Sequence, residues 1–376
     1  MVYRQIGQTD MKISALGFGC MRLPMTEKDG TPIVDDALTT PLLLRAVELG
    51  INFFDAHWFY CNYDCQRAMG HALASVRDQV YLSSKIQLAL INKPADFREY
   101  LERSLEQMGA EYLDFYHFPA LSYRTWQEKI LPLRLIDEAE KAKAQGLLRH
   151  LSFSFHSDPD KMPELIDTGA FTTVLGQYNL VDRRNEEFFT YAKGKGVGTM
   201  VMGPLMGSVL TDGGETFLKR MASPASSAAE MGLRFVWSAP FIDVVLSGMN
   251  TLEQLETNVV YAQQANNIPV AERLSLLERS EELKSLNDLY CTNCNYCAGC
   301  PANIRIGNIF QLYLQHHIWG LGEAVALRLA SYQPTGNAVP ASACTACGQC
   351  LPRCPQGIVI PQELARVWEV LQGLSR

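Results

Sequence analysis

The chain has 376 residues, 47% of them hydrophobic and 19% charged, with a net charge of −7 and a pI near 5.6. This composition allows a large buried core and excludes wholesale disorder. The acidic balance argues against a nucleic-acid-binding protein, which would carry a basic stripe. The sequence shows neither a signal-peptide pattern nor an apolar run of about 18 residues, so we expect a cytoplasmic protein without a membrane span.

Short apolar segments alternate with segments of helical spacing over roughly the first 260 residues. The helical segments include 39–50 and 97–109, where Gly50 and Gly109 occupy predicted C-caps. Strands that are apolar on both faces, with helices between them, predict an α/β fold, the parallel (β/α)8 or TIM barrel. A doubly wound sheet is the alternative, but the GFGCMR segment lacks the third glycine of a dinucleotide fingerprint. The eight predicted strands are 15–19, 51–55, 80–85, 112–117, 148–155, 173–179, 198–203 and 242–248.

The remaining part of the chain is predicted to be mainly helical. One helix is expected over 268–289, two more over 306–320 and 323–332, and a loop over 333–342. The predicted domains are therefore a barrel over 1–265, followed by a smaller helical domain over 266–376.

Eight of the 11 cysteines lie in two closely spaced motifs, each ending in Cys-Pro. Three thiolates at two-residue spacing can bind one face of a [4Fe–4S] cubane, while the fourth cysteine of such a motif binds the other cluster. The spacing predicts a ferredoxin-like domain with two [4Fe–4S] clusters. The expected ligands are Cys291, Cys294, Cys297 and Cys354 for one cluster, and Cys300, Cys344, Cys347 and Cys350 for the other.

Two zinc sites are the alternative, because paired CxxC is also zinc spacing, although zinc does not require the trailing Cys-Pro. The first motif has two residues before its last cysteine, where the bacterial ferredoxin pattern has three. A long helical insert separates the motifs. With this insert, the region resembles the α-helical ferredoxin domains that are attached to larger oxidoreductases.

Segments of the predicted barrel resemble the aldo-keto reductases. NFFDAHWFY (52–60), VYLSSKI (80–86) and YLDFYHF (112–118) are similar to the second, third and fourth strands of that family. The opening segment 3–24 is similar to the start of family members that carry a ferredoxin tail. The resemblance covers nearly the whole chain, and LSFSFH, GQYN, VMGPLMG and LSGMNTLEQLETN extend it to the later cofactor-binding segments.

Four polar residues are candidates for catalysis at the C-terminal ends of the strands. Asp55, Lys85 and His117 end three successive predicted strands, and Tyr60 follows the second. An ammonium group beside a tyrosine favours the phenolate, so Tyr60 could serve as a general acid with Asp55 holding Lys85. Taken singly, a strand-end Asp is often a helix cap and a Lys a surface charge.

His117 departs from the family pattern. The family histidine follows the aspartate of the fourth strand by five residues, a position that Pro119 occupies here. Residues 117 and 119 point to the same face of a strand, about 6.6 Å apart. His117 therefore either reaches the site from deeper in the barrel or is a core histidine.

The resemblance implies a nicotinamide cofactor, NAD(P)H. The family's basic residues are replaced by Met206, Gly248, Met249 and Gln254, and a 2′-phosphate without a cation loses a strong contact. The binding of NADPH is therefore expected to be weaker relative to that of NADH, and a flavin (FMN) is an alternative cofactor. The predicted cofactor-binding residues are Ser154, Gln177, Asn179, Gly203, Leu205, Ser247, Gly248, Gln254 and Asn258.

Three more cysteines, Cys20, Cys61 and Cys65, follow the first two strands near His57. They could bind a metal or act as thiols, or they could simply be small residues packing a loop. Apolar side chains that are expected near the same barrel end suggest an aromatic or apolar substrate. They are Trp58, Phe59, Phe118 and Phe155.

These features predict an iron–sulfur oxidoreductase. Its barrel would reduce or oxidise a small carbonyl-type substrate, and its clusters would exchange electrons with an external ferredoxin- or flavodoxin-type carrier. A non-catalytic electron-transfer subunit with a degenerate barrel is the alternative, and a redox sensor is a third hypothesis that would require a partner domain.

Overall fold

The computed structural model describes residues 1–156, 161–284, 289–332 and 338–374. The chain forms two compact units. The first comprises 1–178, 183–202 and 236–268, and the second comprises 179–182, 203–235 and 269–376. The domain boundary predicted after residue 265 lies close to Pro269, but the second unit also contains two segments from within the predicted barrel domain. The predicted two-domain division stays a prediction.

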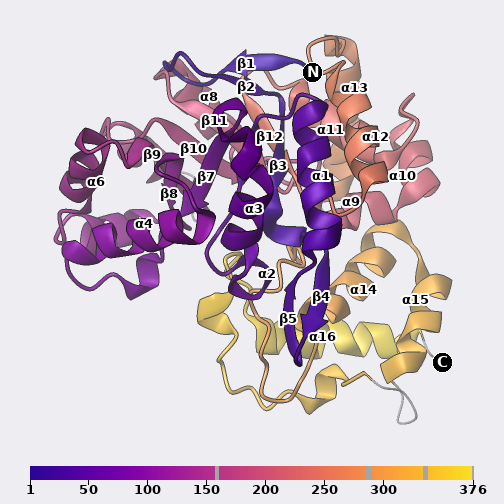
Figure 1. The fold of residues 1–376 in the computed structure, drawn as a ribbon. Coiled ribbons are helices and arrows are strands. Elements are labelled where there is room, and N and C mark those ends of the chain that lie inside the picture. Colours follow the sequence, from indigo (N-terminus) through magenta and orange to yellow (C-terminus); the bar gives the residue numbers. More distant parts are fainter. Residues whose placement is uncertain (157–160, 285–288, 333–337, 375–376) are drawn as a thin grey trace. The chain divides into compact units, whose positions relative to one another are not determined.

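Eight parallel strands close into a barrel, in the order β10-β11-β12-β3-β6-β7-β8-β9 (Figure 1). Each of the eight predicted strands is confirmed, and so is the TIM-barrel fold class. The strands are β3 (Leu16–Gly19), β6 (Phe53–Asp55), β7 (Tyr81–Lys85), β8 (Leu113–Phe118), β9 (Leu148–Phe155), β10 (Thr173–Gln177), β11 (Gly198–Met202) and β12 (Val244–Ser247).

The two-residue period of the strands decides which side chains enter the barrel. Phe53 and Phe115 belong to the apolar core inside the barrel, so Asp55 and His117, two residues further along β6 and β8, also point inward. The register pairs Asp55 with Ser83 and Lys85 with His117. Polar side chains from three neighbouring strands therefore meet at the C-terminal end of the barrel.

A hairpin of β1 (Tyr3–Gln5) and β2 (Lys12–Ser14) lies at the other end of the barrel. Ile6, Met11 and Ile13, from the hairpin and its turn, pack with the innermost barrel side chains in one buried cluster. This end of the barrel is closed by apolar packing, which leaves the C-terminal end for chemistry.

Helices surround the barrel strands. The predicted helices over 39–50 and 97–109 are confirmed as α1 and α4, with Gly50 (φ 92°) and Gly109 (φ 59°) in left-handed conformations after them. The helices of residues 36–194 are α1 (Asp36–Glu48), α2 (Tyr60–Tyr63), α3 (Cys65–Leu73), α4 (Ala95–Met108), α5 (Tyr123–Thr125), α6 (Leu135–Ala144), α7 (Met162–Ile166) and α8 (Glu186–Gly194). Helix α12 (Leu252–Ala262) follows the last strand.

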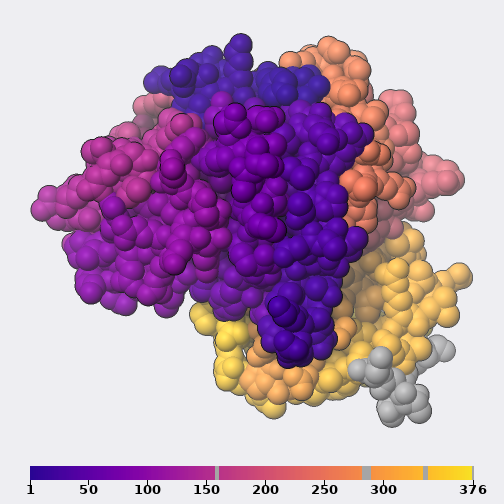
Figure 2. All heavy atoms as spheres, in the orientation of Figure 1, coloured from indigo at the N-terminus to yellow at the C-terminus, as the bar shows by residue number. Residues whose placement is uncertain are grey.

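A second hairpin, β4 (Met25–Lys28) and β5 (Thr31–Val34), projects from the surface of the first unit (Figure 2). It is fixed to the turn after β6, because Asn62 Nδ2 donates to the Pro32 carbonyl at 2.9 Å and the Val34 amide donates to Asp64 at 2.9 Å. The hairpin thus supports the segment that carries Tyr60.

The second unit is mainly helical, as predicted. Its helices 306–320 and 323–332 are confirmed as α14 and α15, and the helix predicted over 268–289 is α13 up to Lys284. Residues 285–288 of that predicted helix and 333–337 of the predicted loop lie outside the described residues. The helices after β11 are α9 (Val209–Asp212), α10 (Gly214–Met221), α11 (Ala228–Trp237), α13 (Val270–Lys284), α14 (Ile306–Trp319), α15 (Gly322–Leu329) and α16 (Ile360–Gly373).

Helix α14 packs against the segment that follows β11. The indole of Trp319 donates to the Val209 carbonyl at 2.7 Å and lies 4.2 Å from the ring of Phe217, while Gln315 donates to Asp212 at 2.7 Å. These contacts explain why residues 203–235 belong to the cysteine-containing unit. Within the described part of the chain, no helix is long and apolar enough to cross a bilayer.

Candidate functional site

A buried ion pair forms the centre of the barrel site. Lys85 Nζ lies 2.5 Å from Asp55 Oδ2 and 3.0 Å from the Ala56 carbonyl oxygen. The side chains are 4% and 6% exposed, respectively, so water does not compete for either charge. Two of the predicted catalytic residues therefore fix each other's position.

Ser83 extends this pair to His117. The Ser83 hydroxyl donates to Asp55 Oδ1 at 2.9 Å and lies 3.0 Å from His117 Nε2. Since the hydroxyl has one proton and gives it to the carboxylate, neutral His117 donates from Nε2. Burial and then the Lys85 charge lower the pKa of His117 to about 4, so its ring is neutral at neutral pH. Lys85, Asp55, Ser83 and His117 thus form one hydrogen-bonded chain, called the polar relay below.

Tyr60 lies beside the ion pair. The Lys85 ammonium is 5.3 Å from the centre of the Tyr60 ring, and the imidazole of His57 is also 5.3 Å from that ring. The three residues after Tyr60 have positive φ angles (Cys61 52°, Asn62 54°, Tyr63 69°), which cost non-glycine residues roughly 1–2 kcal/mol each. Such strain is typical of functional segments held by their surroundings.

Cys20, Cys61 and Cys65 come together beside this turn. The thiols of Cys61 and Cys65 both donate to the Cys20 carbonyl oxygen, at 3.5 and 3.2 Å. Hydrogen bonding to Cys65, followed by burial, raises the pKa of Cys61, and burial raises that of Cys65. These thiols are protonated and of low reactivity, as expected for packing residues.

Six of the predicted cofactor-binding residues lie in the first unit. Ser154 accepts from the Ala120 amide at 2.9 Å, while Ser247 and Asn258 bond to each other at 3.3 Å. Gln254 accepts from the Asn250 amide at 3.0 Å, at the start of α12. The other two, Gln177 and Gly248, lie at and just after the ends of β10 and β12.

The other three, Asn179, Gly203 and Leu205, lie in the second unit. The Asn179 amide donates to the Gly203 carbonyl and to the Tyr290 hydroxyl, both at 2.9 Å, and its oxygen accepts from two backbone amides. Asn179 is fully buried, and these protein contacts use both ends of its amide. It links the loops after β10 and β11 to the residue before Cys291.

Three residues that the sequence analysis did not select lie in the barrel site. Ser83 bridges Asp55 and His117, His57 contacts Tyr60, and the Arg22 Cδ lies 3.7 Å from where a Cβ would stand at Gly248. The aliphatic part of the Arg22 side chain therefore lies beside the loop that precedes α12. The two-residue spacing of Ser83 and Lys85 could have predicted that both side chains point into the barrel. The position of Arg22 beside Gly248 could not be predicted in this way, because it depends on the pairing of β12 with β3.

Two of the four aromatic residues that we expected near the site point elsewhere. Phe118 contacts Phe97 and Phe171, and Phe155 contacts Phe188, so both pack outward against the helices. They occupy the outward positions of strands whose alternate residues face the barrel interior. Trp58 and Phe59, in contrast, lie beside the His57 ring, at 6.1 and 4.2 Å.

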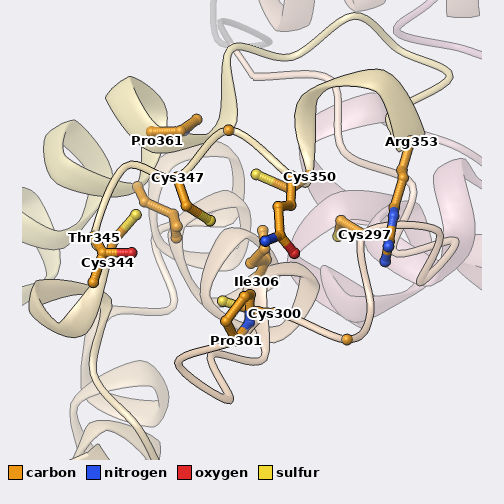
Figure 3. Close-up of a pocket in the computed structure, with 14 residues that line it drawn as sticks. Cys297, Cys300, Pro301, Ile306, Cys344, Thr345, Cys347, Cys350, Arg353 and Pro361 are labelled. Atoms are coloured by element: carbon orange, nitrogen blue, oxygen red, sulfur yellow. The ribbon is translucent and has the colours of Figure 1, made fainter.

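The second unit contains a small pocket that is lined by five cysteines (Figure 3). Thiols of Cys300, Cys344, Cys347 and Cys350 face this space. In the described parts of the chain, no three His, Cys, Asp or Glu side chains are close enough to hold a single metal ion. The cavity is also lined by Cys297, Gly299, Pro301, Ile306, Thr345, Gly348, Gln349, Arg353, Pro361 and Leu364.

Electrostatic repulsion couples thiols of the two cysteine motifs. Burial raises the pKa of Cys291 to about 12, and repulsion from Cys294, Cys297 and Cys354 adds to the effect. Burial also raises the pKa of Cys350, with repulsion from Cys344, Cys347 and Cys300. The neighbours of Cys291 and Cys350 are those of the predicted crossed sets, whereas Cys297 is repelled by Cys294 and Cys354 and also by Cys350 of the other set. The crossed ligand sets stay a prediction.

The two cysteine loops share a backbone pattern. In each loop, the residues on either side of the second cysteine have positive φ angles: Asn293 (50°) and Asn295 (64°) in the first, Ala346 (52°) and Gly348 (74°) in the second. Alternating left-handed residues turn backbone amides toward a common concave side, which suits an anionic group. Arg353 joins the loops by donating to the Ala298 carbonyl at 2.8 Å.

The chain was compared with known families. Residues 15–267 match the model of the aldo/keto reductase family, and residues 290–359 match that of a 4Fe-4S dicluster domain, which supports iron–sulfur clusters in this region.

Individual relatives are distant. An uncharacterized oxidoreductase of Bacillus subtilis, YqkF, is 24% identical over 315 residues, covering 75% of this chain and 94% of that protein. L-galactose dehydrogenase of Arabidopsis thaliana is 24% identical over 296 residues, covering 70% and 89%. Among solved structures, the aldo-keto reductase AKR11C1 from Bacillus halodurans has a similar fold, with a TM-score of 0.64, 23% identity, and coverage of 74% of this chain and 96% of that chain.

Proposed function

Because the chain belongs to the aldo/keto reductase family, we propose that its barrel reduces or oxidises a small carbonyl-type substrate, with Tyr60 as general acid and base. The observation that carries this proposal is the buried Lys85–Asp55 pair beside the Tyr60 ring. A fixed ammonium stabilises the phenolate that remains when Tyr60 has given its proton to the substrate oxygen. The match to a 4Fe-4S dicluster domain supports iron–sulfur clusters in the same chain.

A bound nicotinamide would supply the hydride. The residues at the barrel end that suit it are Ser154 and Gln177, together with the loop at Gly248, where Arg22 and the start of α12 offer positive charge to a phosphate. Arg22 supplies a cation that the 246–258 segment lacks. This feature favours NAD(P)H over a flavin in our proposal.

We propose the crossed cysteine sets as ligands of two [4Fe–4S] clusters. The pocket lined by five cysteines, the mutual repulsion of thiols from the two motifs and the matching backbone of the two loops all fit thiolate-bound cubanes. When bound, two clusters supply two one-electron carriers, as many electrons as one hydride contains. Cys347 is exposed, which supports electron exchange with an external ferredoxin- or flavodoxin-type carrier.

The activity is tested with protein purified without oxygen. Acid release of bound small molecules shows whether a flavin is present, and turnover of a panel of carbonyl compounds with NADH, NADPH or reduced ferredoxin identifies the electron donor. We expect Tyr60→Phe to abolish turnover with the iron content unchanged. Tyr63→Phe is the matched control, because Tyr63 lies in the same turn but is 58% exposed. Equal turnover by the two variants would overturn the role of Tyr60 as general acid, and absence of turnover in the wild-type protein would support an electron-transfer subunit with a non-catalytic barrel.

A further inference from the structure

Three histidines are affected by the charge of Lys85. Burial, and then the Lys85 charge, lowers the pKa values of His57, His117 and His156, and in each ring Nδ1 is buried without a hydrogen-bond partner among the described residues. An unsatisfied buried polar atom is unfavourable, and three in rings affected by one ammonium group are unusual. Such atoms indicate a site where a polar group of a ligand completes the hydrogen bonding.

Only one of these rings lies on the segment that carries Tyr60. His57 follows Ala56, whose carbonyl holds Lys85 at 3.0 Å, and the His57 carbonyl accepts from the Tyr60 amide at 3.1 Å. One turn of chain therefore fixes the histidine relative to both the lysine and the tyrosine. The rings of His57 and Tyr60 are 5.3 Å apart.

The surroundings of His57 keep its ring neutral. Burial, and then the charge of Lys85, hold the pKa of His57 well below 6.5. A neutral imidazole can donate one hydrogen bond without adding a second positive charge beside Lys85. The rings of Trp58 and Phe59 pack against it and limit access of water, which strengthens a hydrogen bond to a ligand.

His117 is less suited to this task. Its Nε2 is already bonded to Ser83, and the residue is fully buried. It acts on the Asp55 side of the relay, whereas His57 lies on the Tyr60 side. The two rings therefore have different hydrogen-bonding environments, although both are neutral.

We propose that His57 is a second catalytic residue of the barrel, donating a hydrogen bond to the substrate oxygen that Tyr60 protonates. The inference rests on the proposed function. In the reducing direction, hydride from a nicotinamide forms a bond to the carbonyl carbon, the π electron pair moves to oxygen, and the Tyr60 proton joins that oxygen. His57 keeps its own proton throughout and stabilises the negative charge that develops on oxygen.

The test compares His57→Phe, which removes the hydrogen bond, with His57→Gln, which retains a donor. His71→Gln is the control, because His71 is an exposed histidine on α3. We expect His57→Phe to lower kcat by about 10²-fold or more, with the Kd for nicotinamide cofactor unchanged. His57→Gln should recover at least about a tenth of the wild-type kcat, and His71→Gln should match the wild type.

The outcomes separate this inference from the proposed function. If Tyr60→Phe abolishes turnover but both His57 variants keep kcat within about twofold, the role of His57 is overturned and the function stands. The hydrogen-bonding role of His57 is also overturned if His57→Phe is stably folded and His57→Gln is equally inactive. If the wild-type protein turns over no carbonyl compound with any donor, the proposed function fails, and the role of His57 fails with it. Thermal melting of each variant identifies losses that arise from unfolding.

Discussion

The barrel site and the cysteine cavity are organised by different interactions. In the barrel, Lys85, Asp55, Ser83 and His117 hold one another through hydrogen bonds between side chains, so the polar site is assembled by the protein itself. In the cavity, left-handed backbone positions shape the loops while the thiols face open space. The barrel should therefore keep its site without a cofactor, whereas the cysteine unit should depend on the group that its thiols bind.

The largest effect should come from removing cluster ligands in pairs. Under crossed ligation, Cys291→Ser with Cys354→Ser removes two ligands of one cluster, whereas Cys344→Ser with Cys354→Ser damages both clusters. We expect the first variant to retain about four of about eight iron atoms and the second to retain almost none. Iron and acid-labile sulfide analysis of protein purified without oxygen measures the difference.

The opposite ranking of the two double variants would show uncrossed ligation. Bound zinc with no labile sulfide in the wild-type protein would exclude clusters altogether. In both double variants, the binding of nicotinamide measured by fluorescence titration should persist if the barrel is independent of the clusters. If nicotinamide binding were lost together with the iron, the barrel site would not be independent of the cysteine unit.

The next largest effect should come from Lys85→Met. The change removes the ammonium that stabilises the Tyr60 phenolate, so kcat should fall by roughly 10²- to 10⁴-fold. It also leaves the Asp55 carboxylate buried without its partner, which should cost about 3–5 kcal/mol of unfolding free energy. Denaturant unfolding and steady-state kinetics measure the two effects.

A second carboxylate in the same barrel separates stability from activity. Asp114 is fully buried and bonded to Arg77 at 3.0 Å and Arg149 at 2.8 Å, away from the polar relay. Asp114→Asn should lower stability and leave kcat unchanged. If Asp114→Asn reduced kcat as strongly as Lys85→Met, the loss in the lysine variant would reflect general destabilisation of the barrel.

The barrel was readable from the sequence because its signal is local. Each strand is a short run of buried apolar residues, and Gly50 and Gly109 mark helix ends through their left-handed conformations. The spacing of the cysteines also predicted the crossed arrangement, which stays a prediction. Helix α16 was not predicted, although its buried residues Ile360, Leu364, Val367 and Leu371 have helical spacing.

The site was only partly readable because its contacts join distant strands. Ser83 meets His117 through the register of β7 and β8, and Arg22 meets Gly248 through closure of the barrel. Neither contact can be predicted from the spacing of residues along the sequence. The outward direction of Phe118 and Phe155 follows from strand alternation, which residue type alone did not reveal. The remaining site assignments stay predictions.

The smallest of the expected effects is on the pH dependence of barrel stability. The pKa of His117 is about 4 in the folded chain and near 6.5 when unfolded, so the unfolded chain binds more protons between these values. The contribution of His117 is complete above pH 6.5 and is lost as the pH falls toward 4, by about 3 kcal/mol. His117→Gln should remove this loss, so its unfolding free energy should fall less steeply on acidification. The difference between the two proteins, measured by denaturant unfolding at pH 7.5 and 4.5, cancels any acid lability of the cysteine unit that they share. Parallel pH dependences would show that burial and the Lys85 charge do not hold His117 neutral, and would contradict the view that the protein assembles this polar site by itself.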